Sequence, residues 1–184
     1  MKAERSLKSR ALQLLAQRDQ SRLELRRKLV RQARRAQAAA SAAGTLSADA
    51  DVAPDIDVAA IAAEVDALLD WLEANRFLSD ERFAESRVHA RAQRFGVQRI
   101  RSELAQHAVE LTPELAASLA ASEIDRAAAV RSRRFAAVAA SAAERASQSR
   151  FLLGRGFSPE LVQRLMRRLA RADTSASEGA PGAD

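Results

Sequence analysis

The amino-acid sequence predicts an all-α protein made of three tandem three-helix repeats. Alanine and leucine dominate the 47% of the 184 residues that are apolar, which suits closely packed helices better than a sheet. A leucine followed four residues later by a small residue occurs at Leu29, Leu104 and Leu152. The small residues, which we expect to mark turns, are Ala33, Ala108 and Gly156. Such repetition indicates helical units that bury their apolar faces against their neighbours.

The first repeat opens with two helices. Apolar residues at helical spacing predict one helix over residues 2–18, and Ser21 is a suitable N-cap for the next. In that second helix Leu25 and Leu29 face inward, and the basic side chains remain outside. Residues 36–54 are low in complexity, and we interpret them as an insertion because Leu29 and Leu104 are 75 residues apart, whereas Leu104 and Leu152 are 48 apart. Its alanines can prolong the helix, but we expect residues 44–54 to be mobile.

A strong amphipathic pattern over residues 55–75 predicts the third helix. Asn75 is expected to end it, because asparagine tolerates the left-handed conformation found at helix C-termini. Ser79 or Asp80 then caps a helix of the second repeat that buries Phe83, Val88 and Ala90. The same helix is predicted to expose a stripe of arginines at positions i, i+4 and i+7: Arg87, Arg91 and Arg94.

The remaining helices are separated by glycines and by Thr-Pro or Ser-Pro pairs. Gly96 precedes a helix whose Ile100 and Leu104 face the core, and Thr112-Pro113 opens the next. In the third repeat Gln148 replaces an apolar residue. Arg155 lies between Gly154 and Gly156, and Ser158-Pro159 opens the last amphipathic helix. We predict repeats over residues 1–78, 79–121 and 122–171, followed by a disordered tail over residues 172–184.

Basic residues are concentrated at the two ends of the chain. Residues 1–35 contain 12 basic and 3 acidic side chains, and residues 127–171 contain 10 basic and 2 acidic ones. This distribution favours a polyanionic or acid-lined partner that contacts both ends. An arginine-rich solvated surface is the alternative interpretation.

Several functional classes have no support in the sequence. There is no cysteine, the two histidines His89 and His107 have no ligand spacing, and no metal or cofactor is expected. A phosphate-binding loop, a pair of carboxylates in a cleft and a Ser/His/Asp arrangement are all lacking, so we do not expect an enzyme. The adjacent Asp80 and Glu81 are explained by a helix N-terminus. No stretch approaches 18 apolar residues, so we expect a soluble, cytoplasmic protein without membrane contact.

Four ordered strings resemble the RecX regulatory proteins of bacterial recombination: SRLELRRKL, NRFLSDERFAESRV, FGVQRIRSEL and FLLGRGFSPELV. The resemblance spans residues 7–170. The sequence departs from the family pattern in the enlarged segment 36–54, and Asn75 and Ala108 stand where the family commonly has glycine.

The resemblance implies a curved, elongated stack of three three-helix repeats that binds in the groove of the RecA filament on DNA. It further implies suppression of RecA ATPase, strand exchange and coprotease activity in recombinational repair and the SOS response. Binding to single- and double-stranded DNA without strong sequence preference is also implied, and we expect a monomer.

The candidate residues for RecA or DNA contact are basic and are expected to pair with acidic groups or phosphates. They are Arg22, Arg26, Arg27, Arg87, Arg91, Arg94, Arg99, Arg101, Arg155, Arg164, Arg167 and Arg168. A second hypothesis is a helix-turn-helix-like, sequence-specific transcription regulator, because such proteins also join short helices through glycine-containing turns. Against it, the segment 112–120 carries no array of Arg, Asn or Gln that would read bases.

Overall fold

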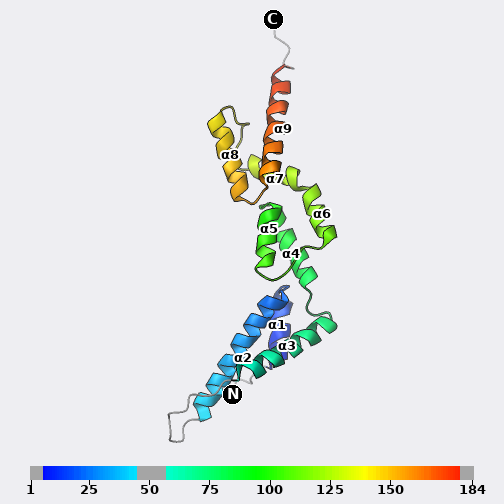
Figure 1. Ribbon diagram of the computed structural model, residues 1–184, viewed down its shortest axis with the longest axis vertical. Coiled ribbons are helices and arrows are strands. Elements are labelled where there is room, and N and C mark those ends of the chain that lie inside the picture. Colours follow the sequence, from blue (N-terminus) through cyan, green and yellow to red (C-terminus); the bar gives the residue numbers. More distant parts are fainter. Residues whose placement is uncertain (1–5, 45–56, 179–184) are drawn as a thin grey trace. The chain divides into compact units, whose positions relative to one another are not determined.

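The computed structural model describes residues 6–44 and 57–178, and in these ranges it contains nine α-helices and no strand (Figure 1). The prediction of an all-α helical repeat protein is therefore confirmed for the described part of the chain. The helices are α1 (Leu7–Gln17), α2 (Arg22–Gly44), α3 (Val58–Ala74), α4 (Asp80–Ala92), α5 (Val97–Ala105), α6 (Pro113–Ala121), α7 (Glu123–Ser132), α8 (Ala142–Gly154) and α9 (Pro159–Glu178).

The described residues form two compact units. The first ends at Phe83 and also includes His107–Val109, and the second contains the remaining described residues from Ala84 onward. The boundary thus lies inside α4. The division into repeats at residues 78 and 121 stays a prediction.

The core of the first unit is formed by α1, α2 and α3, which pack together (Figure 1). Leu25 and Leu29 of α2 are fully buried, as predicted, against apolar side chains of α3 such as Leu69. The N-cap assigned to Ser21 is confirmed, because its hydroxyl accepts a hydrogen bond from the Glu24 N–H at 3.1 Å. Ser6 caps α1 in the same way. These caps satisfy amide groups that a helix leaves without internal partners.

Helix α2 is longer than the sequence pattern suggested. It continues through residues 36–44, so Ala33 lies inside the helix and the prediction of a turn there was wrong. The physical reason is the run of Ala, Gln and Arg after Leu29, since all three residue types favour the helix. The predicted mobile segment 44–54 lies outside the described residues, apart from Gly44, the last residue of α2.

In the turn after α3, the residue with the left-handed conformation is Arg76, one residue later than expected. Asn75 is the C-cap but has φ −92°, whereas Arg76 has φ +61°. The Asn75 side chain donates a hydrogen bond to the Trp71 carbonyl at 2.8 Å and so holds Asn75 in the helical turn. Ser79 then caps α4 by accepting from the Arg82 N–H at 3.2 Å. Asp80 instead accepts from the Arg22 N–H at 2.7 Å, at the first residue of α2.

Helix α4 buries Phe83, Ala84 and Val88, but Ala90 is exposed, contrary to the prediction. Ala90 follows Ala84 by six residues, which is about 240° around a helix, so it points away from the buried face. The helix ends at Ala92, before Arg94.

The second unit contains an apolar core contributed by α7, α8 and α9. Phe157, Leu161 and Leu165 are buried in it, which agrees with the amphipathic pattern predicted for the last helix. The predicted caps are also confirmed: Thr112 accepts from the Leu115 N–H and Ser158 from the Leu161 N–H. Helix α9 continues past Arg171 to Glu178, so the first part of the predicted tail is helical rather than disordered. Residues 179–184 lie outside the described part.

Within the second unit, the turn before α5 touches the turn before α9, backbone against backbone. The Gly96 N–H donates to the Arg155 carbonyl at 3.0 Å. A Cβ added to Gly96 would lie 2.2 Å from the Gly156 carbonyl oxygen, and one added to Gly156 would lie 2.4 Å from the Arg99 Cβ. Gly156 also has φ +82°, which favours glycine. Only glycines permit this approach, and it brings arginines of the two turns together.

Candidate functional site

Two of the predicted arginines on α2 hold the first unit together. Arg22 forms ion pairs with Asp70 and Glu73 of α3, each at 2.6 Å. Arg26 donates two hydrogen bonds to the Asp66 carboxylate, at 2.6 and 2.8 Å. Burial by itself would lower the pKa of Arg22, but its acidic partners outweigh this effect and raise it. Both side chains therefore have internal partners that any outside ligand must displace.

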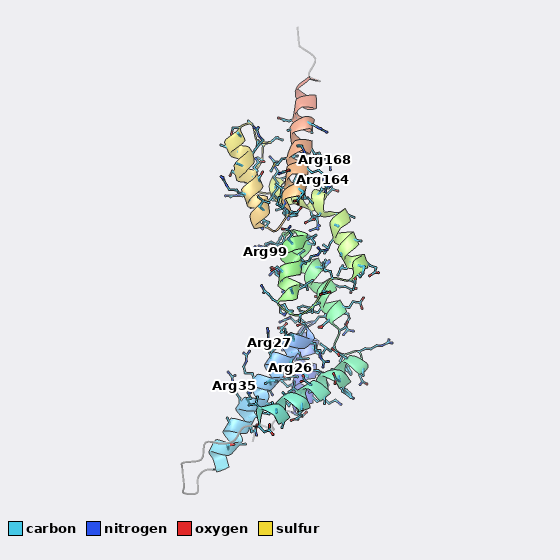
Figure 2. All side chains as sticks on the ribbon, in the orientation of Figure 1. Arg26, Arg27, Arg35, Arg99, Arg164 and Arg168 are labelled. Carbon is cyan, nitrogen blue, oxygen red and sulfur yellow. The ribbon has the colours of Figure 1, made fainter. Side chains whose placement is uncertain are left out.

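The opposite side of α2 carries an exposed arginine surface. We call it the α2 arginine face, and its members are Arg27, Arg31, Arg34 and Arg35. They recur at i, i+4, i+7 and i+8, the spacing that puts residues on one side of a helix (Figure 2 labels Arg27 and Arg35). Sequence reasoning found only Arg27. Arg31 lies within the helix that was expected, and the same periodicity would have revealed Arg34 and Arg35 had α2 been expected to continue beyond Ala33.

The predicted stripe of Arg87, Arg91 and Arg94 does not form a common exposed surface. Arg87 is half-buried, and the Arg91 Nε lies 2.8 Å from the Glu103 Oε2. Because α4 ends at Ala92, Arg94 belongs to the following turn instead of the helical face. The stripe is therefore replaced by a different grouping.

That grouping surrounds the ring of Phe95, which is only 8% exposed. We call it the Phe95 arginine cluster, and it consists of Arg91, Arg94, Arg99 and Arg155. Their guanidinium carbons lie 5.3, 5.6, 4.4 and 5.6 Å from the ring centroid, in that order. Cations attracted to one aromatic ring are held close together despite their mutual repulsion. All four were candidates from the sequence, but their meeting at one ring was not foreseen.

The cluster contains more positive than negative charge. Its paired carboxylate is that of Glu103, 2.8 Å from Arg91 and 3.5 Å from Arg99. Arg155 also lies over the Phe151 ring at 5.0 Å. Four guanidinium groups with one paired carboxylate leave excess positive charge, and planar guanidinium groups suit phosphate or carboxylate oxygens. The cluster thus combines an excess of positive charge with side chains whose shape suits an anionic ligand.

Two side chains of α7 fix the turn that carries this cluster. The Glu123 carboxylate accepts a hydrogen bond from the Val97 N–H at 2.8 Å, at the first residue of α5. The Arg126 guanidinium donates to the carbonyls of Ala92 and Phe95, at 2.8 and 3.1 Å. Burial lowers the pKa of Arg126, and its charge is met by carbonyl dipoles. Sequence reasoning missed both residues, because nothing in the pattern indicates contacts between α7 and the end of α4.

A third basic surface lies on α9. Arg164, Arg167 and Arg168 are exposed, although they alternate along the helix with the buried Leu161 and Leu165 (Figure 2 labels Arg164 and Arg168). The ion pair from Arg168 to Asp125 is 3.5 Å long, and both side chains are mostly exposed, so it is weak. We call these three residues the α9 arginine face. Arg101 on α5 is exposed as well.

Other kinds of site have little support in residues 6–44 and 57–178. No group of three or more His, Cys, Asp or Glu in these ranges is arranged to hold a metal ion. His107 packs against Phe83, with ring centroids 5.0 Å apart. None of the helices described is both long and apolar enough to cross a membrane.

Comparison with known families identifies two segments. Residues 79–110 match the model of the second three-helix domain of RecX, and residues 121–166 match that of the third three-helix domain. These matches include α4, α5, α7, α8 and the first part of α9.

Proteins that are similar over most of their length carry the same family name. The regulatory protein RecX of Herbaspirillum seropedicae is 46% identical over 160 residues, which cover 86% of this chain and 87% of the relative. That of Ralstonia pickettii is 42% identical over 176 residues, with 95% and 92% covered. The crystal structure of RecX from Lactobacillus salivarius aligns with a TM-score of 0.58, covering 89% of this chain and 94% of its own. At 16% identity, this likeness concerns the fold alone.

Proposed function

The chain belongs to the RecX family of regulatory proteins, and on this premise we propose that it binds the RecA–DNA filament and lowers RecA activity. The activities affected are ATP hydrolysis, strand exchange and coprotease function in recombinational repair and the SOS response. The relatives are named regulatory proteins, and we propose that this chain too acts by binding and not by catalysis. Its partners are the RecA filament and DNA, and it acts as a monomer in the cytoplasm.

The observation that carries this proposal is the Phe95 arginine cluster. A DNA-containing filament offers phosphate oxygens at regular intervals, and guanidinium groups bind such oxygens with charge-assisted hydrogen bonds. The α2 and α9 arginine faces supply further positive charge, one in each compact unit. We assign Arg22 and Arg26 a structural role instead of a binding role, because they already form ion pairs with acidic residues of α3.

The first test measures RecA itself. Sub-stoichiometric amounts of the chain are expected to slow DNA-dependent ATP hydrolysis by RecA, since one bound regulator affects neighbouring protomers of a filament. Unchanged turnover in the presence of excess chain contradicts the proposal.

The second test assigns the effect to the cluster. Reversing two charges, with Arg99→Glu and Arg155→Glu, is expected to weaken both DNA binding and ATPase inhibition at least about tenfold, because each lost phosphate contact costs affinity. Arg145→Glu together with Arg150→Glu is the matched control: it makes the same charge change at two exposed positions of α8, outside the three arginine surfaces. Equal losses in the cluster variant and the control would show that only overall charge matters.

A third test addresses sequence preference. Contacts to phosphates predict equal affinity for random duplexes of the same length. Enrichment of one defined half-site from a random pool would favour a transcription regulator instead.

A further inference from the structure

The first unit exposes two aromatic side chains, and they contact one another. Trp71 at the end of α3 is 37% exposed, and Phe77 in the following turn is 47% exposed. The other five aromatic residues of the chain are buried or half-buried. A ligand that covers this aromatic surface removes apolar area from water, which favours its binding.

The two rings form a stack. Their centroids are 5.7 Å apart and their planes differ by 19°. The Lys8 ammonium of α1 lies 3.5 Å from the centroid of the Trp71 ring. Because Lys8 occupies the Trp71 ring, the more exposed Phe77 offers the open surface of the stack. We call this arrangement the Trp71–Phe77 stack.

The backbone holds the Trp71–Phe77 stack in place before any ligand arrives. The Phe77 N–H donates to the Leu72 carbonyl at 2.9 Å, and the Arg82 guanidinium donates to the Phe77 carbonyl at 3.0 Å. Leu78, the next residue, is 2% exposed and anchors the turn in the core. The stack is therefore already ordered, and binding a ligand does not cost the free energy of ordering it.

The charges around the stack favour an anionic ligand. Three exposed basic residues lie close to the stack. Lys8 lies over the Trp71 ring, Arg76 precedes Phe77 in the chain, and Arg82 donates to the Phe77 carbonyl. The ion pair between Arg82 and Asp19 is 3.8 Å long and therefore weak. The acids of α3 closest in sequence, Asp70 and Glu73, are both paired with Arg22, so this group keeps one net negative charge against the three positive charges at the stack. An aromatic surface with a cationic border suits a ligand that combines flat rings with phosphates.

We propose that the Trp71–Phe77 stack binds an unpaired base of single-stranded nucleic acid, with Lys8 and Arg82 near the adjoining phosphates. Base faces in a duplex are covered by their neighbours, so only a single strand can place a base on Phe77. This inference rests on the proposed function, because it takes DNA as the partner. It adds a contact that distinguishes single strands from duplexes, which the arginine surfaces do not.

Trp71 is the only tryptophan of the chain, so its fluorescence reports on the stack directly. The full chain is titrated with oligothymidylate and with a mixed-sequence duplex of equal length, at one salt concentration. Labelled samples of both DNAs give binding by fluorescence anisotropy. We expect saturating oligothymidylate to quench Trp71 and the duplex to leave it nearly unchanged.

Variants at Phe77 locate the contact. Phe77→Leu keeps apolar bulk but removes the flat ring, and it should weaken oligothymidylate binding roughly tenfold with little change for the duplex. Phe77→Tyr restores a ring and should restore affinity. Leu153→Ala is the control, because Leu153 is an exposed apolar residue outside the first unit. Since Phe77 is nearly half exposed, both Phe77 variants are expected to fold, and circular dichroism verifies this.

The outcomes separate this inference from the proposed function. Binding of oligothymidylate by anisotropy without quenching of Trp71 overturns the stacking site and leaves the proposed function intact. Quenching by RecA in the absence of DNA, but not by oligothymidylate, overturns it too and assigns the stack to protein contact. If neither DNA raises the anisotropy, both the inference and the DNA-binding part of the proposed function are wrong.

Discussion

At the scale of single residues, the partner of each arginine decides what that arginine does. Arg26 on α2 is held by Asp66, so it joins two helices. Arg27, the next residue, is exposed on the α2 arginine face. Arg99 has both a partial partner, Glu103, and an aromatic ring at 4.4 Å. Arginine thus joins two helices at position 26, is an exposed charge at position 27, and is a member of the Phe95 arginine cluster at position 99.

Glu103 competes with ligands for the Phe95 arginine cluster. Replacement by the neutral isostere, Glu103→Gln, should increase DNA affinity about threefold at low salt, since a partly exposed ion pair is worth less than about 1 kcal/mol. Fluorescence anisotropy measures the affinity, and a thermal melt verifies the fold. Glu114→Gln, an exposed acid on α6, is the control. Unchanged or lower affinity for Glu103→Gln would mean that Glu103 only positions Arg91.

Gln148 illustrates a polar residue at an apolar position of the repeat. It is 5% exposed and accepts a hydrogen bond from Nε of the equally buried Arg131 at 2.8 Å. Gln148→Leu restores the apolar pattern but leaves the Arg131 Nε without this acceptor. We expect a loss of about 1–3 kcal/mol in unfolding free energy, measured by urea denaturation.

The double variant Arg131→Met, Gln148→Leu tests whether the Arg131 Nε without an acceptor causes this loss. Its loss should be smaller than the sum of the two single losses, because no buried donor then lacks an acceptor. Additive losses would show that the two side chains stabilise the unit independently.

At the scale of helices and turns, the contact between Gly96 and Gly156 positions the arginine cluster. Gly96→Ala would place a Cβ 2.2 Å from a backbone carbonyl, so we expect it to lower the unfolding free energy by about 1–3 kcal/mol. Gly154→Ala is the matched control, since no atom lies within 4 Å of the added Cβ and alanine favours the helix. Denaturant melts of both variants measure the difference. Equal stability of the two variants contradicts the close approach.

The pairing of α2 with α3 should depend on pH. The hydrogen bond from Arg26 of α2 lowers the pKa of Asp66, which lies on α3. A carboxyl group with a lowered pKa stabilises the fold above its unfolded value of about 4, and this contribution is lost as the pH falls through the folded value. Asp66→Asn should therefore lower the melting temperature at pH 7, and the difference from wild type should shrink below about pH 4. A difference that stays constant with pH would exclude the charge as its cause.

At the scale of the whole molecule, positive charge on both compact units predicts strongly salt-dependent DNA binding. The logarithm of the binding constant should fall linearly with that of the salt concentration, by about 0.7–0.9 for each phosphate neutralised. Arg99→Gln together with Arg155→Gln should reduce this slope by up to about 2. Binding titrations at several salt concentrations measure it. An unchanged slope would place the Phe95 arginine cluster outside the DNA contact.

If both units contact the same DNA, losses from the α2 arginine face and from the cluster should add in free energy, because the two groups are independent. Combining Arg27→Gln and Arg31→Gln with the cluster variant tests this by the same titrations. A combined loss no larger than that of the cluster variant alone would exclude the α2 arginine face.

The sequence by itself determined the helical class, most helix starts and the buried leucines, because these depend on local periodicity and on capping side chains such as Ser21 and Thr112. The candidate arginines could also be identified from the sequence, by their charge alone. Only the tertiary structure decided which of them are free to bind, since ion pairs such as Arg22 with Asp70 join residues 48 positions apart. It likewise decided that Arg94, Arg99 and Arg155 meet at Phe95, because that meeting depends on two glycine turns packing together, and local periodicity does not encode contacts over such separations.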